Sequence, residues 1–383
     1  MKQVFRVFWG CMLAAALALT GCGRGGAPGS SGAGSMSGSG SGAMSGGTAG
    51  QEQTWRTGLG VVTEAAGSDR AGKITTAAAA VVLDADGKLA DVMLDELELS
   101  VSGGSTGSVT TPEDVRSKRT KGEDYPLAAA SSLGKGWAEQ ADWFADYLTG
   151  RTPDEVKKLK TDENGKSQDA DLVSGCTIAV DRYRDAVVRA CEQAKALGAA
   201  QGDRATLSLI AADLPRDLAA TDDQDAHVQA DITLAALTVD SNGRVTSAIG
   251  DMTQPQLTVS ADGTVSGPEE PVYTKNEQGD KYGLREASAL HKEWYEHAEG
   301  YCSTLKGKTM AEKVDEHGGK GRYIFSRLFP KVSIMKNTYP VLEKCSVLLP
   351  FYYLVRLFSR LRHRKKEIRS EVRQLKNSKG DRP

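Results

Sequence analysis

The sequence predicts an α+β protein made of two tandem units, each a small β-sheet followed by helices. Three observations support this fold class. A stretch of the chain occurs twice, each copy contains a strong hairpin turn, and each copy continues into a segment with apolar residues at helical spacing. The two units are expected at residues 51–200 and 201–317, and the second is truncated.

Each copy begins with a predicted β-hairpin. The segment AAVVLDADGKLADVMLDELELSVS, residues 79–102, matches LAALTVDSNGRVTSAIGDMTQPQLTVS, residues 234–260. Asp86-Gly87 and Asn242-Gly243 lie between runs of alternating apolar residues, and such pairs favour tight turns because they accept positive φ angles.

The helical part repeats at a constant offset of 157 residues, from Tyr125 to Tyr282 and from Trp137 to Trp294. EDYPLAAASSLGKGWAEQADWF matches DKYGLREASALHKEWYEHAEGY. The apolar spacing around Trp137 predicts that each tryptophan anchors its helix to the sheet of its own unit. Stacking of the indoles on a flat ligand is the alternative.

The N-terminus has the pattern of a secretory signal peptide over residues 1–21. Lys2 and Arg6 precede an apolar run from Val7 to Leu19 that is short for a membrane span. The following LTGC resembles a bacterial lipobox, which implies that Cys22 carries acyl chains and becomes the new N-terminus. The protein is then expected on the extracytoplasmic face of the cell membrane. The alternative is an ordinary secretory signal with a chance cysteine.

Residues 22–50 consist mainly of glycine and serine and predict a flexible tether between the lipid and the folded body.

The motif DLVSGCT, Asp171 to Thr177, precedes a predicted helix, IAVDRYRDAVVRACEQAKAL. Ser174 or Thr177 is expected to cap this helix, and Gly175 permits a tight backbone turn. Free amides and the helix dipole at such a helix start favour an anion, such as a phosphate.

The motif resembles the Asp-x-x-Ser/Thr-Gly-Ala-Thr signature of FMN-binding domains in membrane electron-transport complexes, and the following helix is similar as well. In that family a flavin transferase attaches FMN to the last threonine through a phosphodiester, outside the cytoplasm. The resemblance implies that Thr177 carries FMN, with Asp171, Ser174 and Gly175 at the other motif positions. Cys176 departs from the family, which has alanine there. The wider body resembles extracytoplasmic lipoproteins of anaerobic bacteria.

Two functions follow from these patterns. The first is a membrane-anchored lipoprotein that binds FMN for electron transfer and works with a flavin transferase and a redox partner. The second is a non-catalytic surface or binding lipoprotein without flavin, in which Thr177 only caps a helix. Neither is a catalyst in its own right.

Other chemistry has little support in the sequence. No P-loop occurs, and His291 and His297 are six residues apart, which places them on different faces of a helix rather than at the zinc-protease spacing. No nucleic-acid partner is expected.

The composition changes after about residue 318. Residues 320–383 contain 17 Lys and Arg and 4 Asp and Glu, a net charge of +13 in a chain whose total is −2. The pattern FPxxxxMKxxYPVLEKxxxLLPFYYLxRLF resembles the C-terminal end of nucleotidyltransferase-like proteins, whose catalytic part is absent. Residues 318–383 are therefore expected to be a basic helical tail. It is either a foreign fusion or an amphipathic segment that binds anionic membranes.

Overall fold

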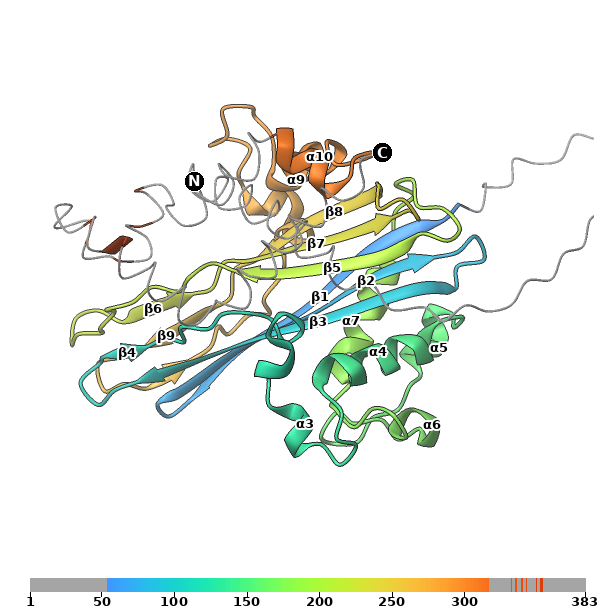
Figure 1. Ribbon diagram of the computed structural model, residues 1–383. Coiled ribbons are helices and arrows are strands. Elements are labelled where there is room, and N and C mark those ends of the chain that lie inside the picture. The colour runs from blue at the N-terminus through green and yellow to red at the C-terminus, as the bar shows by residue number, and fades with distance from the viewer. Residues whose placement is uncertain are drawn as a thin grey trace, which may run out of the picture.

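The computed structural model describes residues 54–316, together with Val332, Met335, Tyr339, Leu342, Leu349, Tyr352 and Tyr353. It is a mixed α/β structure with three antiparallel sheets and several helices (Figure 1), compatible with the predicted α+β class. The predicted signal peptide, Cys22, the tether up to residue 50 and most of the tail from residue 318 lie outside the described residues. Within the described part, no helix has the length and apolar character needed to cross a membrane.

The first sheet has four strands in the order β1-β2-β3-β4, and all neighbours are antiparallel. The strands are β1 (Arg56–Ser68), β2 (Ala71–Leu83), β3 (Leu89–Gly103) and β4 (Val109–Thr110). All residues of β2 from Ile74 to Leu83 are buried, because both faces of this strand are covered. This explains its unbroken run of small and apolar residues.

The other two sheets have three strands each. The second sheet has the order β5-β7-β8, with β5 (Arg204–Ala211), β7 (Ile232–Val239) and β8 (Val245–Thr253). The third has the order β10-β9-β6, with β6 (Ala226–Gln229), β9 (Gln256–Val259) and β10 (Val265–Ser266).

The turns that join β2 to β3 and β7 to β8 use the same hydrogen bonds. In each turn an aspartate Oδ1 accepts bonds of 2.8–2.9 Å from the backbone N–H groups two and four residues later. These aspartates are Asp84 and Asp240, and Gly87 and Gly243 supply the positive φ that each turn requires. Both predicted hairpins are confirmed.

The helices fall into two groups along the chain. The first group is α2 (Lys118–Lys121), η2 (Gly122–Asp124), α3 (Leu127–Ala130), α4 (Trp137–Leu148), α5 (Pro153–Lys157), α6 (Ala170–Val173) and α7 (Asp181–Glu192). The second is α8 (Lys275–Gln278), η3 (Gly279–Tyr282), α9 (Trp294–Ser303) and α10 (Met310–Glu316).

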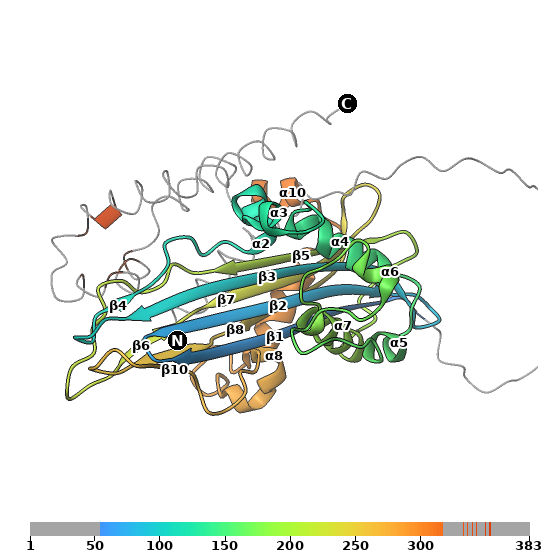
Figure 2. The ribbon, with the colours of Figure 1, turned by 90° about the horizontal axis from the view of Figure 1, so that it is seen from below.

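The first and second sheets pack face to face, with helices on both outer faces (Figure 1). The core between the sheets includes Leu97 and Leu99 of β3, Leu207 of β5 and Leu234 of β7. Helices α4 and α7 cover the outer face of the first sheet, and α9 covers that of the second. Figure 2 shows that α4, α5, α6 and α7 gather over one end of the long strands, while β4, β6 and β10 lie at the other end.

The two repeated tryptophans anchor their helices, as predicted. Trp137, at the start of α4, is buried in the same apolar cluster as Leu94 of β3. Trp294, at the start of α9, is buried with Met252 of β8. Trp137 therefore packs on the first sheet and Trp294 on the second.

A buried aspartate in each of the two main sheets holds the first turn of a short helix. Asp95 in β3 accepts a hydrogen bond from the backbone N–H of Arg119 in α2 (3.0 Å). Asp251 in β8 accepts the equivalent bond from Asn276 in α8 (3.1 Å). Burial raises the pKa of both carboxyl groups, that of Asp251 to about 7.

Helix α7 approaches β1 closely because glycines stand at the contact. A Cβ atom at Gly58 would lie 1.9 Å from the carbonyl oxygen of Ala190. One at Gly60 would lie 2.0 Å from that of Ala186. The helix that follows the DLVSGCT motif is thus seated directly on the backbone of the first strand.

The described residues of the tail form a separate apolar cluster. Met335, Tyr339 and Leu342 are buried, and Leu349, Tyr352 and Tyr353 pack against them.

Gly60→Ala is expected to lower the free energy of unfolding by about 3 kcal/mol, because the added methyl group forces α7 away from β1. Urea unfolding of both proteins measures the change. Gly300→Ala is the matched control, since a Cβ there meets nothing within 4 Å on helix α9. It should leave stability unchanged or raise it slightly. Equal losses in the two variants would contradict the packing argument.

Asp251→Asn is expected to change how stability depends on pH. The pKa of Asp251 rises from 3.8 to about 7 on folding, so between these values the folded protein binds a proton that the unfolded chain has released. This group therefore makes stability fall as pH rises through that window. Asparagine keeps the acceptor oxygen and does not titrate.

The Asp251→Asn variant should accordingly gain stability relative to the wild type between pH 4 and pH 8, by up to roughly 4 kcal/mol. Urea unfolding of both proteins at several pH values measures the difference. A difference that stays constant over this range would show that Asp251 does not titrate in the way its burial implies.

Candidate functional site

The DLVSGCT motif lies in α6 and in the segment between α6 and α7, beside α4. Asp171 and Ser174 are exposed, and the Ser174 hydroxyl donates to the backbone carbonyl of Asp171 (2.7 Å). Gly175 is buried and Thr177 is half-buried. The four predicted site residues therefore divide into an exposed pair and a pair that faces α4.

Thr177 is held by a single side chain of α4. The Oε1 atom of Gln140 accepts hydrogen bonds from the Thr177 backbone N–H (2.8 Å) and from the Thr177 hydroxyl (3.1 Å). Gln140 is fully buried, and its Nε2 donates to Ser131 Oγ and to the Lys135 carbonyl, both at 3.0 Å. The position of the Thr177 hydroxyl thus depends on the loop before α4 as well as on the motif.

Gly175 allows the motif to lie against the indole of Trp143. A Cβ at position 175 would lie 2.2 Å from two indole carbons, so no other residue fits without a shift. Trp143 is 42% exposed although it is a large apolar side chain, and the Lys135 ammonium lies 4.8 Å from its ring centroid. Gln140 and Trp143 are three residues apart and share one face of α4. The motif therefore borders a half-exposed aromatic ring and a cation.

Cys176 points into the protein, away from this surface. It is 1% exposed and belongs to the apolar cluster between the first sheet and its helices. Burial raises the pKa of its thiol to about 11, so the group stays neutral. Cys191 and Cys302 are also buried and free.

Neither Ser174 nor Thr177 caps α7, so this part of the sequence prediction is wrong. The N-cap residue of α7 is Val180, which forms no side-chain capping bond. The backbone N–H groups of Val180 and Asp181 instead donate to the carbonyl of Gly165, at 2.7 and 3.2 Å. The prediction started the helix directly after the motif, whereas α7 begins only at Asp181.

The anion site expected at the helix start stays a prediction. At the start of α7 the Gly165 carbonyl takes the N–H groups of the N-cap residue Val180 and of Asp181. At α6 the side chain of Asp169 accepts from the N–H groups of Asp171 and Leu172, and so places a carboxylate at the helix start.

A buried polar network joins α4, α7 and β3 beneath the motif. Trp137 Nε1 donates to the Tyr183 hydroxyl (3.2 Å), and this hydroxyl makes a short hydrogen bond with Glu96. Glu96 also forms an ion pair with Lys118 (2.7 Å). Burial raises the pKa of Tyr183 well above its ordinary value, so the phenol stays protonated and can donate to the carboxylate. These contacts fix α7 relative to α4.

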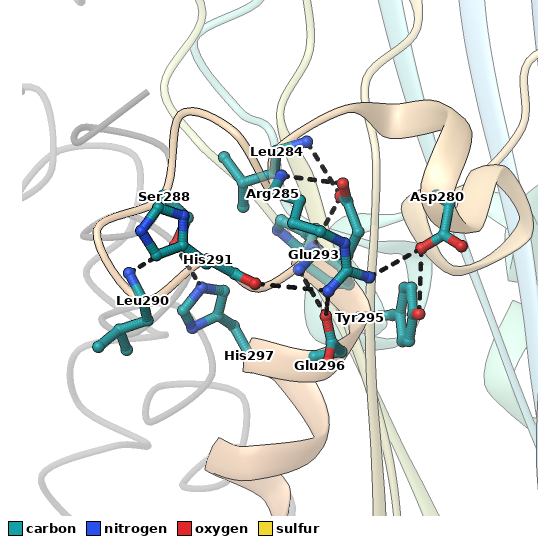
Figure 3. A network of polar contacts seen from close by, with 11 residues as sticks. Asp280, Leu284, Arg285, Ser288, Leu290, His291, Glu293, Tyr295, Glu296 and His297 are labelled. Atoms are coloured by element: carbon teal, nitrogen blue, oxygen red, sulfur yellow. Dashed lines mark hydrogen bonds and ion pairs between the residues drawn. The ribbon is translucent and has the colours of Figure 1, made fainter.

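A second polar cluster lies at the start of α9 (Figure 3). The buried carboxylate of Glu293 accepts from the backbone N–H groups of Leu284 (3.0 Å) and Arg285 (2.9 Å). The Arg285 guanidinium forms an ion pair with Glu296 (2.8 Å). These contacts close the loop that precedes α9.

The same cluster contains a serine–histidine pair, with Ser288 Oγ 2.9 Å from His297 Nε2 (Figure 3). Such a pair can serve as nucleophile and base. The first unit makes the same contact between Ser131 and Gln140, whose amide is no base. Burial, aided by Lys292, lowers the pKa of His297. We interpret both contacts as structural, because each ties a loop to the helix that follows it.

Neither a metal site nor a hydrolase nucleophile has support in the described part of the chain. The part of the chain that the structure describes has no group of three or more His, Cys, Asp or Glu side chains able to hold a metal ion. A Gly-x-Ser-x-Gly pattern occurs at residues 103–107, but it lies in the turn between β3 and β4. The hydrolase version of this pattern joins a strand to a helix.

The sequence prediction of the site missed Gln140, Trp143 and Lys135. Gln140 and Thr177 are separated by 37 residues, and no local pattern links them. The repeat carried a weak signal, because Gln140 is equivalent to His297 and both bind the serine of the preceding loop.

Comparisons of this chain with models of known protein families, with curated proteins and with solved structures found no match.

Proposed function

We propose that this chain is a membrane-anchored extracytoplasmic lipoprotein that carries FMN on Thr177 for electron transfer. The observation that carries the proposal is the setting of Thr177. Its hydroxyl is oriented by Gln140, on the face of α4 that also presents the half-exposed indole of Trp143. The protein would be an electron carrier rather than a catalyst.

The residues around Thr177 suit a phosphate-linked flavin. The indole of Trp143 offers a flat apolar ring for stacking, and the Lys135 ammonium now lies over that ring. A flavin ring taking the place of Lys135 would leave the ammonium free to pair with the negative phosphodiester. This pairing would neutralise part of the charge of the phosphodiester.

The attachment needs an activated flavin phosphate, because an alcohol and a free phosphate do not condense in water. We take a flavin dinucleotide as the donor. The Thr177 oxygen forms a bond to the flavin-side phosphorus, the P–O–P anhydride bond breaks, and the nucleoside monophosphate leaves. The hydroxyl proton passes to a base of the flavin transferase.

The departure from the family motif at Cys176 is compatible with this proposal. Its side chain lies in the core and not on the surface that a transferase would contact. The extra sulfur atom is therefore accommodated by packing within the first unit.

A second candidate is a binding lipoprotein without flavin. The observation that favours it is that both Gln140–Thr177 bonds also tie the loop to α4, which is a sufficient structural role for Thr177. The exposed Trp143 would then be part of a surface for a partner.

Localisation and partners belong to the same proposal. Lipidation of Cys22 would hold the protein on the outer face of the cell membrane, and the tether would let the domain reach a flavin transferase and a redox partner. We further propose that the segments from β1 to α7 and from β5 to α10 are tandem copies. The matched turns at Asp84 and Asp240 and the matched aspartates Asp95 and Asp251 support this. The basic tail from residue 318 would be an addition of separate origin.

The test is intact-mass spectrometry and flavin fluorescence of the full chain, exported together with a bacterial flavin transferase. We expect an added mass equal to FMN minus water, and its complete loss in Thr177→Ala. Ser303→Ala is the control, because it removes an exposed hydroxyl of α9 that lies outside the motif and should leave the added mass intact. An unmodified wild type, or a Thr177→Ala variant that keeps the flavin, would reject the proposal.

A further inference from the structure

We infer that Gln140 is a positioning residue that makes Thr177 the flavin acceptor. The inference rests on the proposed function, because it concerns how the Thr177 hydroxyl is presented for phosphoryl transfer. It assigns a role to a residue of α4 that lies outside the motif and that the sequence pattern did not indicate.

The orientation of the Gln140 amide is determined by its partners. The Ser131 hydroxyl and the Lys135 carbonyl both lie 3.0 Å from Nε2, and the carbonyl can only accept. The Thr177 backbone N–H lies 2.8 Å from Oε1 and can only donate. A flipped amide would place two donors against each other and two acceptors against each other. Only one orientation therefore satisfies this fully buried side chain.

This orientation fixes the Thr177 hydroxyl. A hydroxyl has one proton, and the contact of 3.1 Å with Oε1 uses it, because the amide oxygen can only accept. The lone pairs of the Thr177 oxygen then point away from Gln140. Nucleophilic attack on phosphorus uses such a lone pair, so the contact prepares the hydroxyl for reaction without supplying a base.

The other hydroxyl of the motif has no equivalent support. Ser174 is exposed, and its proton is directed to the Asp171 carbonyl of its own short helix. Of these two motif hydroxyl residues, Thr177 is the one held through both its backbone and its side chain by a buried group. The choice of acceptor within the motif therefore follows from Gln140 as well as from the motif sequence.

The second unit has His297 at the equivalent position. This histidine keeps the contact with the preceding loop, through Ser288. The contact between the helix and the loop before it is thus common to both proposed units. Gln140 in addition accepts two hydrogen bonds from a threonine. Removing the loop contact and removing the threonine contact can therefore be compared in the same helix.

The test measures the rate of FMN incorporation into the full chain by purified flavin transferase, with flavin adenine dinucleotide as the donor. Gln140→Met has the same chain length but no acceptor. We expect its rate at saturating donor to fall about tenfold, with an unchanged KM for the donor. Ser131→Ala removes one of the two loop contacts of Gln140 and keeps both bonds to Thr177, so its rate should stay within about twofold of the wild type. Gly60→Ala controls for lost stability, since it weakens the same unit away from Thr177.

Hydrogen exchange of the Thr177 amide gives a readout that does not depend on flavin. Exchange should speed up in Gln140→Met and not in Ser131→Ala. A Gln140→Met variant modified at the wild-type rate, or a Ser131→Ala variant that loses as much, would overturn the inference and leave the proposed function standing. A wild type that incorporates no flavin would overturn both.

Discussion

The structure depends on the burial of one apolar face of the first sheet against one apolar face of the second. Leu97 and Leu99 of β3 are fully buried opposite strands that begin only after residue 200, such as β7 with Leu234. Burial of such a side chain stabilises the fold by about 2 kcal/mol. Each sheet therefore needs the other to bury the apolar residues of its inner face. Because this contact takes up the inner faces, the outer faces remain for helices. That arrangement places α4 and α7, and with them Thr177, on the outside of the first unit.

The two proposed units, β1 to α7 and β5 to α10, share several contacts and differ where the candidate site lies. Both have a buried lysine at the start of a short helix, Lys118 and Lys275. In the first unit Lys118 pairs with Glu96, which also binds Tyr183 of α7. In the second unit Met252 follows the equivalent aspartate, and Lys275 binds the Tyr282 hydroxyl instead (2.8 Å). Burial lowers the pKa of Lys275 to about 8. The ion pair of a buried lysine with a glutamate is thus found in the segment that also contains α7, the helix after the motif.

The sequence predicted what is encoded locally and missed what depends on distant contacts. Asp-Gly and Asn-Gly located both hairpins because the turn itself requires positive φ, and the helical spacing placed Trp137 and Trp294 in the core. The predicted cap of α7 was wrong because the helix begins only at Asp181, and the carbonyl of Gly165, from an earlier turn, accepts from the N–H groups of Val180 and Asp181. Gln140 could not be predicted, because its bond to Thr177 forms only once α4 and the motif pack on the same sheet. The face-to-face packing of the sheets was not evident either, since alternation shows that a face is buried and not what covers it.

Hydrogen exchange of the full chain carrying Leu234→Ala tests the shared core most directly. Leu234 lies in the second sheet and is fully buried in the core between the sheets. If the two sheets form one cooperative structure, backbone amides of β2 and β3 should lose protection together with those of β7, by the same free energy. If only the amides of the second sheet lose protection while β2 and β3 exchange as in the wild type, the first unit is stable by itself. The placement of Thr177 would then not depend on the contact between the sheets.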